Sequence, residues 1–193
     1  MRKSKQETAE SRAKILRTAA RLLREKGVEG ASIANVMLAA GMTQGGFYRH
    51  FKSKNDMLAE ATRHAFHEVT ERFDHNRDRA GAEAALKSYV AQYLSKQHIE
   101  RPGAGCPTAG FGSDAGRIPK VLGPEFVRGA EGLVERTTSA LAALKKVGDP
   151  ALREEAIRML ALLVGTVVIA RATGDTPLRQ EIIGAAKAVL SGD

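Results

Sequence analysis

The stretch "GMTQGGFYRHFKSKND", residues 41–56, decides the fold of the first third of this chain. Two adjacent glycines, Gly45 and Gly46, stand where a helix begins. Two phenylalanines, Phe47 and Phe51, follow at i and i+4, a spacing that places both on one face of a helix. The stretch carries several basic side chains and no acidic one until its last position. These features predict a short helix with a bare start, an aromatic buried face and a positive exposed face.

The residues in front of this stretch supply the other half of a helix-turn-helix. Ser32 is a favourable N-cap for a short helix that ends near Gly41, and Thr43 is placed to cap a second helix over 44–51. Gly41 adopts a positive φ without steric cost, as the tight turn between them requires. A longer helix over 11–26, with Ser11 as its cap, precedes this pair.

The adjacent glycines have a functional explanation. Without side chains at Gly45 and Gly46, the start of the second helix can approach the major groove of DNA closely. The pair costs about 2 kcal/mol of helix propensity, which packing by the two phenylalanines must offset. Tyr48 and Arg49 then project outward, where Arg49 can pair with guanine or phosphate. The simpler alternative is a surface helix that merely tolerates its glycines.

Apolar residues recur at helical spacing through the rest of the chain, which predicts an all-α fold. A helix begins near Asn55. The polar "DHNRDRAG", residues 74–81, ends it, and a glycine-rich segment lies at 103–119. Further helices are expected at about 82–98, 105–116, 124–146, 150–173 and 177–191.

Charge and composition restrict the class of protein. Of 193 residues, the first 64 hold 13 Lys and Arg against 6 Asp and Glu, whereas the remainder holds 17 against 16. A basic end on a neutral body indicates contact with a polyanion. The longest charge-free apolar run, 159–170, is too short for a bilayer, and the N-terminus lacks the apolar core of a signal peptide. With a single cysteine, we expect a cytoplasmic protein without a membrane partner.

Residues 15–61, "ILRTAARLLREKGVEGASIANVMLAAGMTQGGFYRHFKSKNDMLAEA", resemble the N-terminal domain of the TetR family of transcriptional repressors. The quoted "FYRHFKSK" and the "AAG" before the turn carry the resemblance. Two positions depart from it: many relatives have Ala in place of Met37 and Thr or Ser in place of Gly46. The resemblance implies DNA contacts by the following residues: Ser32, Thr43, Gln44, Gly45, Gly46, Tyr48, Arg49, His50 and Lys54.

The resemblance also implies the organisation of the whole chain. A three-helix helix-turn-helix DNA-binding domain would cover 1–54, and a helical ligand-binding and dimerisation domain would cover 55–193, about nine helices in all. The implied function is that of a regulator, most simply a repressor. It would bind a pseudo-palindromic double-stranded DNA operator as a homodimer and be released by a small-molecule or thiol-reactive inducer.

The last two predicted helices are the candidates for a dimer interface. Their apolar stripes either meet a second copy or fill the core of the protomer itself. Val168 and Val189 belong to these stripes. The complete set of candidates is Leu160, Val164, Val167, Val168, Ile182, Ala186 and Val189.

Four aromatic residues are available to a ligand pocket between the middle helices: Tyr89, Tyr93, Phe111 and Phe126. Each of them is individually more typical of ordinary core than of a ligand site. Cys106, in "GAGCPTAG", is predicted as the N-cap of a helix that Pro107 begins, where a thiol is more reactive and where flanking glycines leave it accessible. The simpler interpretation, which we favour over a sensor, is a small buried apolar residue without a redox role.

No other chemistry stands out. His64 and His67 share a helix with glutamates at i+4, which is more typical of a solvated face than of a metal site. No phosphate-binding loop, paired carboxylates or catalytic triad is recognisable, so we expect no metal, no cofactor and no enzyme. The remaining alternative is a protein that compacts DNA without sequence preference, which affinity for an operator over random DNA would distinguish.

Overall fold

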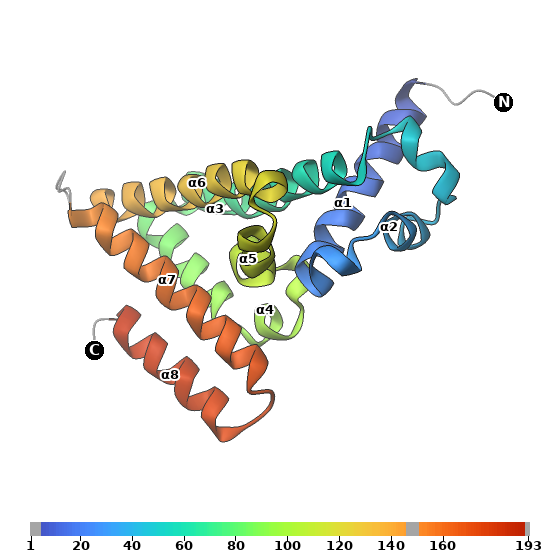
Figure 1. Cartoon of the computed structure of the whole chain (residues 1–193). Coiled ribbons are helices and arrows are strands. Elements are labelled where there is room, and N and C mark those ends of the chain that lie inside the picture. The colour runs from blue at the N-terminus through green and yellow to red at the C-terminus, as the bar shows by residue number, and fades with distance from the viewer. Residues whose placement is uncertain (1–4, 146–150, 192–193) are drawn as a thin grey trace.

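The computed structural model describes residues 5–145 and 151–191, and within these ranges it is helical without strands (Figure 1). The elements follow in this order: α1 (Lys5–Gly30), α2 (Ile33–Ala39), η1 (Gln44–Arg49), α3 (Lys54–Tyr93), α4 (Lys96–Glu100), η2 (Pro102–Ala104), α5 (Pro107–Arg117), α6 (Pro119–Lys145), α7 (Ala151–Ala172) and α8 (Pro177–Ser191). The predicted helix limits at 146 and 150 lie outside the described residues. No described helix is long and apolar enough to cross a membrane.

The helices α1, α2 and η1, residues 5–49, form what we call the head. Ser32 caps α2 by accepting a hydrogen bond from the backbone of Asn35 at 3.2 Å, and Gly41 makes the turn with φ +67°. Two expectations for α1 were wrong. It begins six residues before Ser11, which is therefore buried inside the helix, and it kinks rather than ends at Gly27, where φ is +65°.

The predicted second helix of the pair is a 3-10 helix, η1, rather than an α-helix over 44–51. The tighter winding suits a segment of six residues that opens with two glycines of low helix propensity. Its fully buried side chain is Phe47, and Phe51 follows as a second buried ring just past the end of the element.

The body consists of α3 to α8. The long helix α3 starts beneath the head and kinks at Gly81, so the two helices expected on either side of residues 74–81 are one element with a sharp bend. It packs along α6. Gly129 of α6 lies so close to the Phe66 ring that a Cβ there would overlap it. The short elements α4 and η2 were not predicted, whereas α5 to α8 lie near their expected positions.

Two clusters of buried residues make up the core. The first joins the head to the beginning of α3 and to parts of α5 and α6, and Phe47 and Phe111 are fully buried members of it. The second fills the body between α3, α6, α7 and α8 and includes Tyr89, Tyr93 and Cys106. Because the first cluster crosses residues 54 and 55, packing is continuous at the expected domain boundary.

Candidate functional site

The segment that contains η1 is anchored from inside by aromatic rings. The rings of Phe47 and Phe51 stack with centroids 5.5 Å apart and planes 26° apart. The Arg12 guanidinium of α1 lies 4.8 Å from the Phe51 centroid, and its Nε donates to the carbonyl of His50 at 3.3 Å. These contacts hold the C-terminal end of the segment against α1.

The outer surface of this segment is open. Thr43, Gln44, Gly45, Tyr48 and Arg49 are all exposed, and 71% of the Tyr48 surface is accessible. A Cβ added at Gly45 would have no atom within 4 Å. Close approach to another surface, not internal packing, therefore gives a reason for a glycine at that position.

Thr43 differs from the expectation that it would cap the helix. It occupies the N-cap position with extended backbone, but its side chain makes no capping hydrogen bond. Lys54, half-buried, begins α3, whose cap is Ser53. At Gly46 a Cβ would stand 3.8 Å from the Met37 methyl, which is ordinary van der Waals contact. Met37 is accommodated as a buried side chain next to this glycine.

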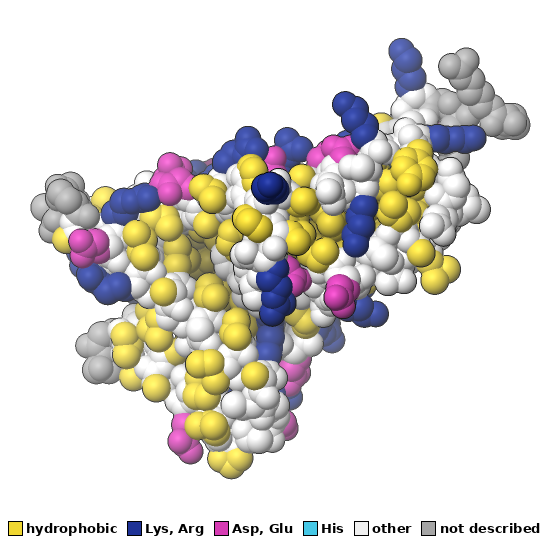
Figure 2. Space-filling model, in the orientation of Figure 1, with side chains coloured by type: hydrophobic (Ala, Val, Ile, Leu, Met, Phe, Trp, Pro, Cys, Tyr) yellow, Lys and Arg dark blue, Asp and Glu magenta, His cyan; other side chains and the backbone are white. Residues whose placement is uncertain are grey.

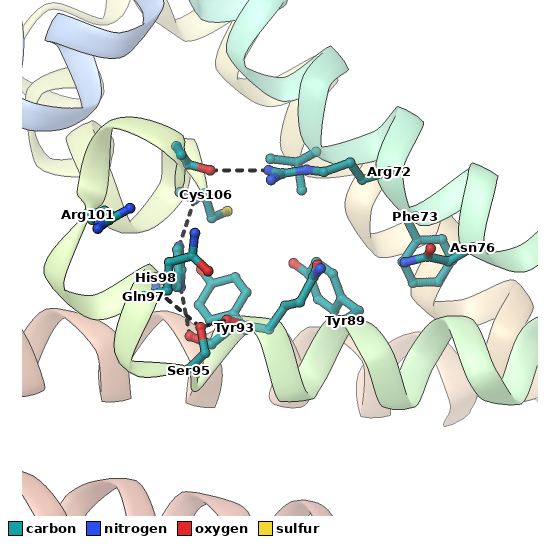
Figure 3. Close-up of a pocket in the computed structure, with 14 residues that line it drawn as sticks. Arg72, Phe73, Asn76, Tyr89, Tyr93, Ser95, Gln97, His98, Arg101 and Cys106 are labelled. Carbon is teal, nitrogen blue, oxygen red and sulfur yellow. Dashed lines mark hydrogen bonds between the residues drawn. The ribbon is translucent and has the colours of Figure 1, made fainter.

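A cavity of about 170 Å³ lies in the body between α3, α4 and η2 (Figure 3). We call it the pocket. It brings together three of the predicted ligand-binding residues, Tyr89, Tyr93 and Cys106. Sequence reasoning missed its polar members because nothing in their spacing marks them. The complete lining is Val69, Arg72, Phe73, Asn76, Tyr89, Gln92, Tyr93, Ser95, Gln97, His98, Arg101, Ala104, Gly105 and Cys106.

Phe111 and Phe126 do not line the pocket. Phe111 is fully buried in the head-side core, and Phe126 packs edge-on against both Phe111 and Phe66. The presence of aromatic residues in the middle helices therefore did not predict which rings share a cavity. The sequence does not show how α5 is rotated against α6.

Cys106 stands at the N-cap of α5 with Pro107 in the first helical turn, as predicted. The expectation that flanking glycines leave it accessible was wrong, because only 4% of its surface is exposed. Its Sγ lies 2.8 Å from the Thr108 hydroxyl, and its backbone N–H donates to Nε2 of His98 at 2.9 Å. The thiol therefore faces the pocket and has almost no contact with bulk solvent.

His98 is held as a neutral ring. Its Nε2 accepts the Cys106 N–H, so Nδ1 carries the proton and donates to the Tyr93 carbonyl at 2.7 Å. Burial, with the nearby charges of Arg171 and Arg72, lowers the pKa of His98 despite the opposing hydrogen bond to Tyr93. The ring thereby ties the end of α3 to the start of α5.

The two pocket tyrosines differ in their hydroxyl partners. Tyr93 Oη lies 3.4 Å from the Thr108 hydroxyl, whereas Tyr89 Oη is buried without a hydrogen-bond partner among the described residues. Burial, with the neighbouring Cys106, raises the pKa of both well above the usual range. Both therefore remain protonated and able to donate.

Arginines from other helices hold the backbone that forms the pocket wall. Arg24 of α1 donates to the Gly105 carbonyl at 3.1 Å and pairs with Glu68 of α3. Partial burial opposes ionisation of Glu68, but hydrogen bonds from His64 and Arg24 bring its pKa down to about 2. Arg72 donates to the Ala104 carbonyl at 3.3 Å. One wall of the pocket is thus bonded directly to the head.

Two further contacts strengthen these connections. Asp114 of α5 accepts the backbone N–H of Val28, at the kink of α1, at 3.0 Å. On the opposite side, Arg171 of α7 donates to the carbonyls of His98, Ile99 and Ala109 at 2.8–3.1 Å. The segment around Cys106 is therefore held between the head and α7.

The predicted dimer residues separate into two groups. Val167 and Ala186 are buried in the protomer's own core and offer no surface to a partner. Val168 and Val189 are exposed, at 46% and 69%, and Leu160, Val164 and Ile182 are partly exposed. Figure 2 shows hydrophobic side chains gathered over α7 and α8. The large exposed apolar residues of these helices are Ile157, Val168, Ile169, Leu178 and Val189.

His64 and His67 each approach a glutamate one turn further along α3, at 3.5 Å to Glu68 and 3.3 Å to Glu71. Within the described ranges, no three His, Cys, Asp or Glu side chains converge as metal ligands would.

An exposed, aromatic-anchored helix-turn-helix on a helical body defines the class of helix-turn-helix regulators. Residues 15–61 match the family model described as bacterial regulatory proteins, tetR family. An uncharacterized HTH-type transcriptional regulator of Mycobacterium tuberculosis is 30% identical over 178 residues, which cover 86% of this chain and 88% of that protein. The chain belongs to the TetR family.

Two other curated relatives match shorter stretches of the chain. The HTH-type transcriptional regulator AcrR of Shigella flexneri is 46% identical over 59 residues, 31% of this chain and 27% of that protein. TtgR of Pseudomonas putida is 35% identical over 69 residues, 36% of this chain and 32% of that protein. The chain matches less than a third of the length of either protein.

Solved structures share the fold over nearly the whole chain. The reduced form of Escherichia coli NemR has a TM-score of 0.76 at 18% identity and covers 92% of this chain and 95% of its own. A TetR-family regulator from Agrobacterium tumefaciens has a TM-score of 0.78 at 19% identity, with coverage of 92% and 96%. At these identities the likeness extends to the arrangement of helices, not to ligands.

Proposed function

We propose that this chain is a transcriptional repressor that binds a pseudo-palindromic DNA operator as a homodimer and leaves it when the pocket is occupied or Cys106 is modified. The observation that carries the proposal is the outer surface of η1. It is open and free of acidic residues, and it rests on the fully buried Phe47. A surface of this kind admits the DNA backbone closely without rearranging the fold.

The DNA contacts divide by chemistry. Thr43 and Gln44, at the start of η1, and Lys54, at the start of α3, suit phosphates. Tyr48 and Arg49 project far enough to reach base edges, where an arginine reads guanine through two hydrogen bonds. The complete set that we propose is Ser32, Thr43, Gln44, Gly45, Gly46, Tyr48, Arg49, His50 and Lys54.

A second copy of the chain is the partner that suits the apolar surface of α7 and α8. Exposed side chains such as Ile169 and Leu178 would be removed from water by it. A two-fold axis through this surface repeats the head, and two heads on one face of B-DNA meet successive major grooves about 34–36 Å apart. This spacing is the physical reason for a pseudo-palindromic operator, and a chromosomal target implies a cytoplasmic protein.

The bonds between pocket and head suggest how release occurs. Gly105, in the pocket wall, is hydrogen-bonded to Arg24 of α1, and Asp114 holds the kink of the same helix. A ligand that displaces this wall moves α1 and α3 together and changes the separation of the two heads. The ligand needs only to prefer the non-binding arrangement by a few kcal/mol.

Cys106 offers a second route to the same displacement. An adduct on its thiol adds volume inside the pocket, because Sγ faces the cavity rather than solvent. NemR, whose fold this chain shares, is described in a reduced form. The Cys106→Ser protein should still bind operator and should no longer respond to maleimides.

The decisive test is sequence preference. Duplexes selected from a random pool by the purified protein should converge on an inverted repeat, and at fixed salt the selected site should bind at least about 10³-fold more tightly than random DNA. Equal affinity for both would favour a compacting protein instead. Sedimentation should give a dimer, and a monomer at micromolar concentration would contradict the proposed assembly.

A further inference from the structure

The pocket has two chemically different ends. Its inner wall consists of side chains that are buried and mostly apolar: Val69, Phe73, Tyr89, Tyr93 and Cys106. Its mouth carries exposed polar and cationic side chains: Arg72, Gln92, Gln97 and Arg101. An aromatic inner end with a polar entrance suits a flat molecule that enters ring first.

Inside this inner wall, one hydrogen-bonding group has no partner. Tyr89 is 8% exposed, and its hydroxyl forms no hydrogen bond with any described residue. Figure 3 shows that hydroxyl turned toward the space between Arg72 and Cys106. A buried hydroxyl without a partner is costly, so a ligand that brings an oxygen to it gains affinity.

The charge at the mouth is of one sign. The lining contains two arginines and no acidic residue, and neither Arg72 nor Arg101 forms an ion pair with a described residue. Glu68 is paired with Arg24, and Glu100, next to Arg101 in the sequence, is paired with Arg179. A cleft with unneutralised guanidinium groups attracts a carboxylate, which arginine binds through two parallel hydrogen bonds.

We propose that the pocket binds a single-ring aromatic acid with a hydroxyl group at the opposite end of the ring, as in 4-hydroxybenzoate. The ring lies among Phe73, Tyr89 and Tyr93, the ring hydroxyl pairs with Tyr89, and the carboxylate meets Arg72 and Arg101. The cavity of about 170 Å³ suits one ring, since a protein cavity of about 150 Å³ accommodates benzene. Only the role of this acid as inducer rests on the proposed function.

The test measures binding to the full chain without DNA, so a failure of operator binding would leave its result unaffected. Calorimetry compares 4-hydroxybenzoate, benzoate, which lacks the hydroxyl, and phenol, which lacks the carboxylate. The wild type should bind 4-hydroxybenzoate at least about fivefold more tightly than either analogue, because each of them loses one polar contact. Phenol binding as tightly as the acid would overturn the proposal.

Two substitutions test which side chain contacts the hydroxyl of the ligand and which contacts its carboxylate. Tyr89→Phe should weaken 4-hydroxybenzoate about five- to tenfold and leave benzoate unchanged, because only the hydroxyl contact is removed. Arg101→Gln should weaken both acids and leave phenol unchanged. Because Arg101 is exposed, Arg101→Gln should keep the fold. It therefore still tests the carboxylate contact if Tyr89→Phe lowers the melting temperature. Equal affinities of both variants and the wild type for all three compounds would contradict the proposed orientation.

The alkylation rate of Cys106 provides an independent measure of whether the pocket is occupied. It is the single cysteine of the chain and lines the pocket, so its alkylation by N-ethylmaleimide, followed by mass spectrometry, reports on the pocket alone. Saturating 4-hydroxybenzoate should slow alkylation severalfold in the wild type and less in Arg101→Gln at the same concentration. Unchanged alkylation together with no measurable heat at millimolar ligand would overturn the proposal.

Discussion

The head and the pocket differ in where their aromatic rings and polar groups face. In the head, Phe47 and Phe51 are buried in the core, and the polar groups of η1 face outward. In the pocket, Tyr89 and Tyr93 form the wall of a hollow, and a hydroxyl faces inward without a partner. The head is built as a fixed surface, whereas the pocket retains an unsatisfied interaction that a ligand can complete.

The backbone shows the same difference. Around η1 the supporting contacts are ring stacking, a cation over a ring and one hydrogen bond from Arg12 to the His50 carbonyl. Around Cys106 the supports are single hydrogen bonds: Arg24 and Arg72 donate to backbone carbonyls, and His98 accepts the Cys106 N–H. Such bonds can break one at a time, at about 0.5–1.5 kcal/mol each, which is why we propose that a ligand rearranges the pocket wall rather than the head.

The largest expected effect on stability tests whether the head is built around Phe47. Phe47→Ala removes a fully buried ring and should lower the free energy of unfolding by about 3–5 kcal/mol. Chemical denaturation followed by circular dichroism measures it. Tyr48→Ala, at a site 71% exposed, is the matched control and should cost far less. Similar losses at both positions would mean that the head is not built around Phe47.

The link between the two regions comes next. Arg24→Gln removes a buried guanidinium that contacts Gly105 and Glu68, and because Glu68 is partly exposed the cost should be about 2 kcal/mol. Operator release by ligand should weaken as well, while ligand binding to the free protein persists. Arg21→Gln, at an exposed ion pair, is the control, and an equal loss of release there would argue against a specific link.

DNA contacts can be separated from stability. Tyr48→Ala and Arg49→Ala should each weaken operator binding by about 1–3 kcal/mol, because each removes a contact to base or phosphate. Titration of a labelled operator at fixed salt provides the measurement. Arg117→Ala, an exposed arginine at the end of α5, should have little effect, and an equal loss there would indicate unspecific electrostatics.

Protonation of His98 should loosen the pocket wall. Its folded-state pKa lies below the usual 6.5, so below pH 6.5 the unfolded chain binds more protons, and stability falls as pH drops toward the folded value. One proton limits the slope to about 1.4 kcal/mol per pH unit. Unfolding at pH 7.5 and 5.5 should show a smaller difference in His98→Asn than in wild type. Exposed His67→Asn should retain the wild-type difference.

The smallest effect on stability is expected at Gly45. Gly45→Ala meets no atom within 4 Å, so the free energy of unfolding should stay unchanged or rise by up to about 1 kcal/mol. Operator affinity should nevertheless fall, because the methyl group separates η1 from DNA. Thermal melting and operator titration on the same sample measure both, and unchanged affinity would show that this glycine does not face DNA.

The head was predictable from sequence because its signals are local. Gly41, Phe47 and Phe51 lie within eleven residues, and each acts through its own backbone or its own helix face. The winding of η1 was not predictable, since spacing does not distinguish a 3-10 turn from one and a half α-helical turns. Ser11 failed as a cap because α1 extends further toward the N-terminus than its apolar pattern does.

The pocket depends on contacts between residues far apart in the chain. Arg24 and Gly105 are separated by 81 positions, and Cys106 is buried in a core cluster to which α3, α6, α7 and α8 all contribute. Neither fact leaves a periodic pattern in the sequence. The tyrosines could be nominated from sequence as aromatic residues of the right helices, but Phe111 was nominated by the same reasoning and lies in another core.

Because the first part of α3 is continuous, a small tilt at one end produces a large displacement at the other. Between Lys54 and Phe73 the helix is uninterrupted, a rod of about 28 Å. If the pocket end tilts by about 5°, the far end swings by roughly 2.5 Å, since a stiff rod of this rise per residue amplifies angle into displacement. In the proposed mechanism, a ligand no larger than one ring could therefore change the distance between the two heads by tilting α3.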